Sequence, residues 1–319
     1  MKRKLINAFP IALFAFAGRA LSVGRIGAWT ALDASAATLL ALAVLPVAAY
    51  ASGAVFGGDG IIGINGIGGK ILYAFFSAGT MAAAFCIAVI SAKEFSNFAA
   101  EVMFLRVPVA VVTVIFLGFC AYLASTGFGT LRKFSLVAFW ITASAAIMLF
   151  LLSVPNFDVS NAEALLEGIG VSAEGTINAF GGIFAPAAVA VIYMSASGDR
   201  KERGVSLATA AVSVLLAAAL LAVCYLNVCL LLGESFGASR QYPYSDAVST
   251  VTAGKLFARM EGFAYVMYYA ASAVKTAVSV SLICLLAKRM LPPKWVKKKL
   301  FEAMPYAVAA ALAATTMAL

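Results

Sequence analysis

The residue most able to do chemistry is Lys275, a lysine near the middle of the long apolar segment from Met260 to Ala287. It belongs to a polar stripe at spacings of four, three and four residues, which lie on one helical face: Tyr268, Ser272, Lys275 and Ser279. A charge at the bilayer centre costs about 2.5–3.5 kcal/mol on insertion scales, so we expect this face to point toward protein or a water-filled cavity. Two interpretations stay open: a ligand or ion site, and a lysine paired with a carbonyl or carboxylate between helices.

A second polar stripe lies in the apolar segment Ile71–Ala92, where Tyr73, Ser77 and Thr80 share one helical face. It resembles the stripe around Lys275 and predicts a helix that lines a site. Ordinary hydrogen bonding between membrane helices through small polar residues is the alternative.

A third candidate is an interrupted helix that begins at about Thr176 and carries Asn178, Gly181, Gly182 and Pro186 within eleven residues. Such an interruption frees backbone groups that only neighbouring protein or a lined cavity can satisfy, and broken helices of this kind form substrate sites in transporters. A packing kink at Pro186 is the alternative.

The elements that must position these residues are membrane helices. Hydrophobic residues make up 63% of the 319 positions and charged residues only 12%, against roughly 25% charged in soluble domains. The net charge of +9 comes from basic residues in short loops between apolar runs. Topology in a lipid bilayer explains them better than a nucleic-acid partner does.

Enzymatic chemistry has little support in this sequence. It contains no histidine, its five cysteines form no CxxC pair, and no glycine-rich loop is followed by a phosphate-binding lysine. We therefore expect no catalytic residues, no cofactor, no metal site and no disulfide framework.

Nine apolar segments are predicted to be helices: Leu5–Ala17, Ala28–Ala51, Ile71–Ala92, Val107–Ala124, Phe134–Val154, one from about Thr176, Val205–Leu232, Met260–Ala287 and Ala303–Leu319. Pro10 interrupts the first, which predicts a short or discontinuous membrane helix; a secretory signal peptide is the alternative. With the N-terminus in the cytoplasm, fifteen Lys and Arg residues fall in inner loops and six in outer segments, and this asymmetry favours that orientation.

Two connecting segments carry acidic residues. The chain from Lys93 to Arg106 is amphipathic, with Glu94 and Glu101 spaced for one helical face, which predicts an interfacial helix or an external gate. The stretch Pro155–Glu174 is acidic and is expected on the outer face.

Several motifs together resemble a known family. The Tyr242-Pro243 turn, Arg259-x-Glu261 and a lysine fourteen residues after that glutamate are similar to the endospore germination permeases. These are the B subunits of nutrient germinant receptors, in the amino acid, polyamine and organocation transporter superfamily. The likeness extends to other positions along the chain: Ala28-Trp29, Glu101, Pro108 and the acidic loop from Asp158 to Glu167.

The resemblance implies an all-α polytopic membrane protein with a leucine-transporter-like fold of two inverted five-helix repeats. A single transmembrane domain over residues 1–319 would hold the first repeat at 5–154 and an incomplete second repeat at 175–319, with nine helices and the tenth missing. The family implies a multi-pass protein of the cell membrane or spore inner membrane, beside an A-type membrane subunit and a lipoprotein subunit.

The resemblance also implies a ligand site at the broken first and sixth helices. Gly181 and Gly182, with Asn178 nearby, would supply backbone groups to the carboxylate of a small amino acid or similar nutrient. The third and eighth helices would line the pocket through the two polar stripes: Tyr73, Ser77, Thr80, Tyr268 and Ser272. Lys275 would stand where related transporters hold a coupling cation.

Besides the missing tenth helix, the chain departs from the family pattern at two places. Pro10 and Ala12 replace the glycine-rich break of the first helix, and Tyr268 replaces a tryptophan. Three functions are compared: a ligand-binding receptor subunit, a proton-coupled or sodium-independent amino-acid permease, and a non-transporting scaffold subunit.

Overall fold

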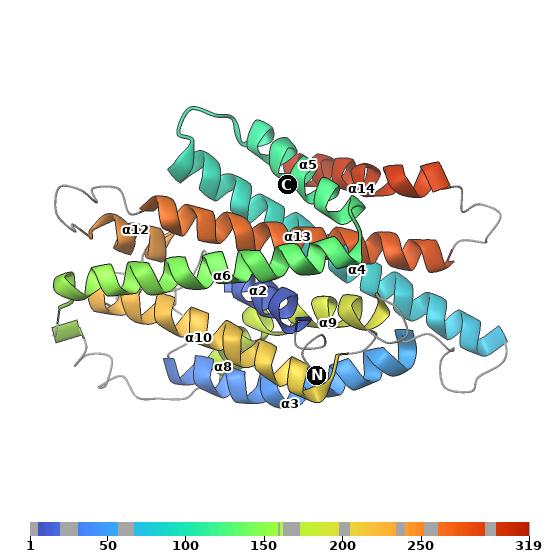
Figure 1. Ribbon diagram of the computed structural model, residues 1–319, viewed down its shortest axis with the longest axis horizontal. Helices are drawn as coiled ribbons and strands as arrows, with labels where there is room; N and C mark the ends of the chain where they lie inside the picture. Colours follow the sequence, from blue (N-terminus) through green and yellow to red (C-terminus); the bar gives the residue numbers. More distant parts are fainter. Residues whose placement is uncertain are drawn as a thin grey trace.

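The computed structural model describes residues 6–19, 31–56, 67–158, 160–161, 173–197, 205–233, 240–251, 261–290 and 298–318. Over these residues the secondary structure is helical, and the long helices run roughly along one axis as a bundle (Figure 1). Four residues of the family-like motifs lie outside the described residues: Ala28, Trp29, Glu167 and Arg259.

The α-helices are α2 (Ala8–Arg19), α3 (Ala31–Phe56), α4 (Ile67–Phe98), α5 (Val109–Ser125), α6 (Phe128–Ser153), α8 (Ala173–Ile183), α9 (Ala187–Ala196), α10 (Leu207–Leu232), α12 (Pro243–Ser249), α13 (Glu261–Met290) and α14 (Lys298–Ala318). Two short elements add a π-helix, η2 (Ala99–Met103), and a 3-10 turn, η3 (Val154–Asn156). Within the described chain five helices are long and apolar enough to cross a membrane, or six if α8 and α9 form one bent span. The prediction of an all-helical multi-pass membrane protein is confirmed.

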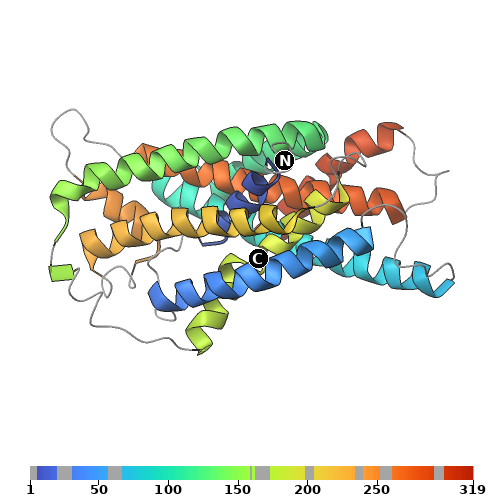
Figure 2. The same ribbon diagram turned by 60° about the horizontal axis from the view of Figure 1, so that its bottom comes forward.

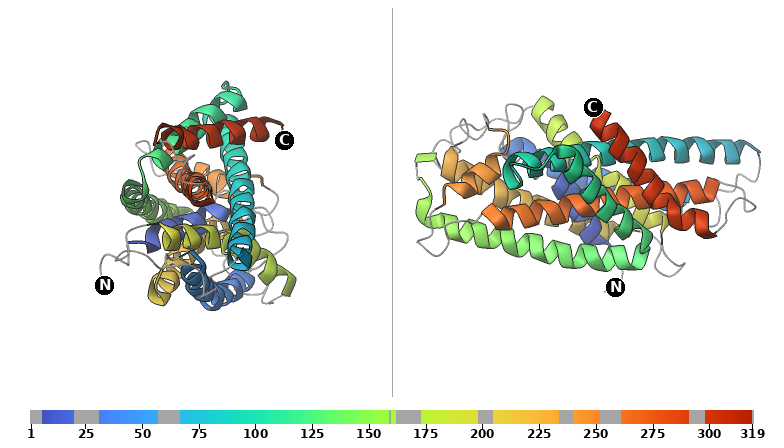
Figure 3. Two further views of the ribbon diagram at one scale, coloured as in Figure 1. Left: turned by 90° about the vertical axis from the view of Figure 1, so that its right-hand side faces the viewer. Right: turned by 90° about the horizontal axis from the view of Figure 1, so that it is seen from above.

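Helix α13 is the centre of the bundle. Its membrane-spanning window is 78% buried within the protein, against 28% for α3 and for α4. It packs against α2, α4, α5, α6 and α14, and the end-on view of Figure 3 shows it enclosed by other helices. A helix buried on nearly every side belongs to the core.

Helix α2 is short and crosses the middle of the bundle obliquely (Figures 2 and 3). Its 12 residues span only about 18 Å at 1.5 Å each, less than the ~30 Å hydrocarbon core. Pro10 is the third residue of the helix, where an N–H has no helical acceptor, so proline is tolerated there. A short first helix is confirmed, and Pro10 stands in its first turn instead of breaking it.

The segment after Lys93 differs from one of its two predicted forms. An interfacial helix is wrong, because α4 continues without a break to Phe98 and then widens into η2. The reason is aromatic packing: the Phe95 ring lies 5.6 Å from the Tyr269 ring, and the Phe98 ring lies 5.1 Å from the Tyr268 ring, both on α13. These contacts keep the segment helical, and the alternative of an external gate stays a prediction.

Candidate ligand-binding site

The predicted interruption is a break between α8, which ends at Ile183, and α9, which begins at Ala187; the two helix axes are bent by 41°. Pro186 accounts for the bend, since it has no N–H and its ring excludes the carbonyl four residues earlier. The predicted interruption is confirmed, and its role as a ligand site stays a prediction.

The hydrogen bonds at the break leave carbonyl oxygens without helical donors. A continuous helix would aim the N–H groups of residues 185, 186 and 187 at the carbonyls of Gly181, Gly182 and Ile183. Instead the Ala185 N–H donates to the Phe180 carbonyl at 2.9 Å, Pro186 has no N–H, and the Ala187 N–H donates to the Phe184 carbonyl at 3.0 Å. Three consecutive carbonyls have lost their helical partners.

The N–H groups that begin α9 are occupied. Ala188 and Val189 donate to the carbonyls of Ala185 and Pro186 at 3.2 and 3.1 Å. The break therefore offers acceptors rather than donors, and acceptors suit a positively charged or hydrogen-bond-donating group. This geometry favours a ligand ammonium group at Gly181 and Gly182, where the sequence analysis expects a carboxylate.

Helix α2 approaches this break more closely than any side chain would allow. A Cβ atom built on Gly18 would lie 2.6 Å from the carbonyl oxygen of Gly182 and 3.5 Å from that of Ile183. The first helix and the broken helix thus meet backbone to backbone, as a site between them requires. Sequence reasoning missed Gly18; the available signal was a glycine near the end of an apolar segment, which often marks close helix packing in membranes.

The polar stripe of α13 is buried. Tyr268 is 1% exposed, Ser272 and Lys275 are each 4% exposed, and Ser279 is fully buried. The Ser279 hydroxyl donates to the Lys275 carbonyl at 3.0 Å. The prediction that this face points toward protein rather than lipid is confirmed. Helix α13, which carries Lys275, packs against α2 and against α9, the helix that follows the break.

The two polar stripes do not meet in one pocket. The Phe98 ring packs on Tyr268, whereas Ser77 lies twenty-one residues earlier on α4, about 31 Å away along the helix axis. Tyr73, Ser77 and Thr80 therefore lie toward the opposite end of the bundle from Tyr268. The Thr80 hydroxyl donates to the Phe76 carbonyl at 2.8 Å.

An aromatic cluster closes the α12 end of the bundle. Around the Phe98 ring lie Tyr242 at 5.0 Å, Tyr265 at 5.7 Å and Tyr268 at 5.1 Å, and the Tyr244 ring lies 6.1 Å from that of Tyr268. Burial raises the pKa of Tyr242 to about 12 and that of Tyr244 well above its usual value. Both phenols are therefore neutral at physiological pH.

Polar contacts tie α12 to η2 above this cluster. The Gln241 side-chain amide donates to the Glu101 carboxylate at 3.1 Å and to the Tyr242 hydroxyl at 3.0 Å. Arg240 and Asp246 form an exposed ion pair at 3.9 Å. Burial raises the pKa of Asp246, and the Arg240 charge opposes that rise. These contacts connect the segment after α4 with the segment before α13.

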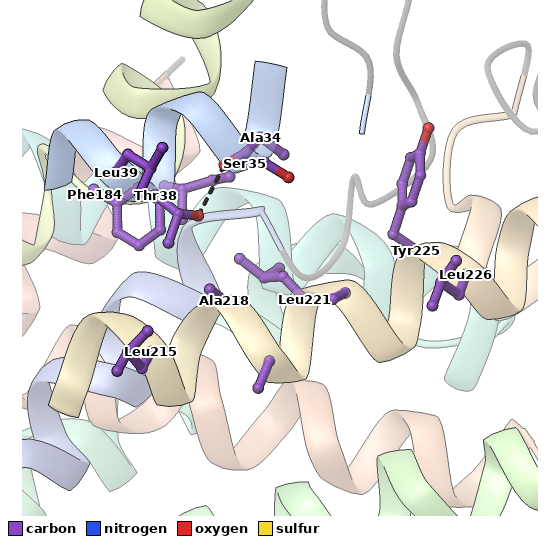
Figure 4. Close-up of a pocket in the computed structure, with 13 residues that line it drawn as sticks. Ala34, Ser35, Thr38, Leu39, Phe184, Leu215, Ala218, Leu221, Tyr225 and Leu226 are labelled. Atoms are coloured by element: carbon purple, nitrogen blue, oxygen red, sulfur yellow. Dashed lines mark hydrogen bonds between the residues drawn. The ribbon is translucent and has the colours of Figure 1, made fainter. Parts of the chain in front are cut away.

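Two apolar pockets flank the break. One, of about 600 Å³, lies between α3 and α10 and reaches Ile183 and Phe184 (Figure 4). The other, of about 500 Å³, lies beside α4 and is lined by Gly181, Pro186 and Thr80 among others. Asn178 and Gly181 are exposed, so they face away from the core, whereas Gly182 is half-buried. The break therefore has room to move on two sides.

Comparisons with known proteins agree with this architecture. A family model described as "spore germination protein" matches residues 38–318. The chain is also similar to the solved structure of a Na⁺-coupled sialic acid symporter in a substrate-bound outward-open state, with a TM-score of 0.66 and 14% sequence identity. The similarity covers 98% of this chain and 71% of the symporter chain. At that identity it shows the fold alone, and the predicted leucine-transporter-like fold is confirmed. No curated protein matches the chain.

Proposed function

Because the chain belongs to the spore germination protein family, we propose that it is the membrane subunit of a spore germinant receptor. It binds a small amino acid or similar nutrient and helps to trigger germination. Its partners are an A-type membrane subunit and a lipoprotein subunit, and its place is the cell membrane or the spore inner membrane, with the N-terminus in the cytoplasm.

Two observations support the proposal: the carbonyls freed at the break, and the buried lysine on the central helix α13, which packs against α9 and α2. The carbonyl oxygens of Gly181, Gly182 and Ile183 suit an ammonium group, and the Lys275 ammonium suits a carboxylate. A small zwitterion carries both groups. An amino acid therefore matches this site better than a purely anionic or a purely apolar ligand.

The role proposed for Lys275 follows from its burial. A cation held in a dry site interacts with a ligand carboxylate more strongly than it would in water. The Lys275 ammonium would itself supply a positive charge in the core, so we propose that ligand binding is independent of sodium. Ser272, one turn before Lys275 on the same face, is the hydroxyl placed best to assist it.

A second candidate function is a sodium-independent or proton-coupled amino-acid permease. The fold shared with a sodium-coupled symporter supports it, since the same architecture serves transport in that protein. Residues 5–154 and 175–319 as two inverted repeats would supply the rocking parts that such a cycle needs.

The test is equilibrium binding and uptake of a labelled amino-acid panel by the full chain in liposomes. Binding without uptake supports a receptor subunit, and uptake makes the protein a permease. A chain that binds no amino acid but assembles with its partner subunits would be a scaffold, and that result would refute the ligand site.

Variants connect this result to the site. Lys275→Met should weaken binding at least about tenfold, since a hydrogen bond to a charged group contributes about 1.5–3 kcal/mol and each 1.4 kcal/mol is a factor of ten. Lys133→Met is the matched control, because Lys133 is exposed on α6. Equal affinity in both variants would remove Lys275 from the site.

A further inference from the structure

The larger pocket beside the break is a groove in the outer surface of the bundle, between α3 and α10. Figure 4 shows Leu215 and Leu226 at its two ends along α10, with Thr38, Leu39 and Phe184 on the opposite wall. Its volume is about 600 Å³, within the roughly 300–1,000 Å³ of sites that hold small ligands.

The groove exists because its walls are built from small residues. Ala218, Ala219 and Ala222 line it on α10, and Ala34 lines it on α3. One polar group of its wall is already satisfied, since the Thr38 hydroxyl donates to the Ala34 carbonyl at 2.8 Å. A hollow with mostly apolar walls suits an apolar occupant.

The location in the membrane identifies that occupant. Both α3 and α10 are membrane-spanning helices, and three groove residues are open to the bilayer: Leu39 is 69% exposed, Leu215 54% and Leu226 41%. From Leu215 to Leu226 the groove runs about 16 Å along α10, close to the ~15 Å that one leaflet contributes to the hydrocarbon core. Lipid acyl chains are the medium at this depth, and one extended chain fits that length.

We propose that the groove between α3 and α10 is a binding site for one acyl chain of a bilayer lipid, and that the bound chain restrains the break in the α8–α9 helix through Phe184. The Phe184 side chain is 1% exposed, lines the groove and occupies the first position after α8. Any change in the bend at Pro186 moves this ring. An occupied groove therefore opposes movement of the ring toward α3 and α10.

The acyl-chain site stands independently of the proposed function, whereas its effect on nutrient affinity rests on that function. The first test uses only the full chain in phosphatidylcholine nanodiscs containing a photoreactive palmitic acid. Labelled peptides should come from α3 and α10 around Leu39 and Leu226, and excess unlabelled palmitic acid should abolish that labelling in a saturable manner. Labelling that is spread over all lipid-facing helices, or that does not saturate, would overturn the proposal.

A pair of variants sharpens the result. Ala218→Phe with Ala222→Phe fills the groove, and Ala310→Phe with Ala314→Phe places the same two substitutions, four residues apart, at exposed positions of α14. The groove pair should lower labelling of α3 and α10 at least about tenfold, and the α14 pair should leave it unchanged. Equal labelling in both would contradict the site, and the competition experiment on the natural chain decides the question if the groove pair does not fold.

The proposed effect of the bound acyl chain on nutrient affinity is measured separately. Nutrient affinity of the natural chain should change several-fold between nanodiscs of saturated and of polyunsaturated phosphatidylcholine, because an extended acyl chain fits the groove and a kinked one does not, and the groove pair should abolish that response. An affinity indifferent to the saturation of the lipid chains would refute the coupling. Saturable labelling without nutrient binding in any variant would refute the proposed function and leave the acyl-chain site intact.

Discussion

The close approach of α2 to the break gives a sharp prediction for Gly18→Ala. The added Cβ would lie 2.6 Å from the Gly182 carbonyl oxygen, which is backbone and has no rotamer by which to withdraw. One of the two helices must therefore shift by several tenths of an ångström. Because the Gly182 and Ile183 carbonyls belong to the ligand site proposed here, the shift should affect both stability and binding.

A matched control separates the cost of the tight contact from the gain in helix propensity that any Gly→Ala change brings. Overpacking a tight contact costs about 1–3 kcal/mol, while replacing a helical glycine by alanine gains up to about 1 kcal/mol. Gly79→Ala on α4 should show only the gain in helix propensity, since its Cβ would meet nothing within 4 Å. We therefore expect Gly18→Ala to be less stable than Gly79→Ala by about 1–3 kcal/mol.

The assay is reversible unfolding in mixed micelles, followed by amino-acid binding in liposomes for both variants. Gly18→Ala should lower the free energy of unfolding relative to the control and weaken ligand binding. Two variants of equal stability and equal affinity would refute the backbone contact between α2 and the break.

Further predictions follow from other features of the site. Pro186→Ala should restore an N–H donor for the Gly182 carbonyl and slow hydrogen exchange at residues 185–189 several-fold, whereas unchanged exchange would mean that the proline does not cause the break. Gly181→Trp should weaken amino-acid binding at least several-fold, because the indole would fill the pocket beside the Gly181 carbonyl; unchanged binding would refute the ligand site at the break. Asp246→Asn tests the raised pKa of that carboxyl. A carboxyl whose pKa is higher in the folded than in the unfolded chain stabilises the fold while it is protonated, below the unfolded pKa near 4. That contribution to the free energy of unfolding is lost as the pH rises through the folded pKa. The stability of the variant relative to the natural chain should therefore increase from pH 4 to pH 7, and pH-independent relative stability would refute the burial effect.

Periodicity along single segments predicts the faces of these helices well. A lysine at mid-membrane is costly in lipid, so the sequence alone predicts that the α13 stripe from Tyr268 to Ser279 faces the interior, without reference to a partner helix. The interruption before Pro186 follows from proline chemistry in the same way. Both depend only on local sequence.

Relations between helices are harder to predict. Tyr73, Ser77 and Thr80 form a stripe like that of α13, but the antiparallel register that pairs Phe98 with Tyr268 carries them to the far end of the bundle. The register of α4 against α13 depends on packing between segments nearly two hundred residues apart, so the pattern along one segment cannot predict it. The contact of Gly18 with Gly182 is hidden for the same reason.

The π-helix η2 has a consequence for the way this chain compares with its relatives. Its ring is closed by the Phe104 N–H donating to the Ala99 carbonyl at 2.7 Å, five residues back instead of four. One residue has in effect been inserted into the last turn, and side chains beyond it are rotated by about 100° relative to an uninterrupted α-helix. Glu101 lies within this widened turn, where its carboxylate accepts the hydrogen bond from the Gln241 side-chain amide. A relative shorter by one residue here would keep all of α4 in place and would aim a different side chain at α12.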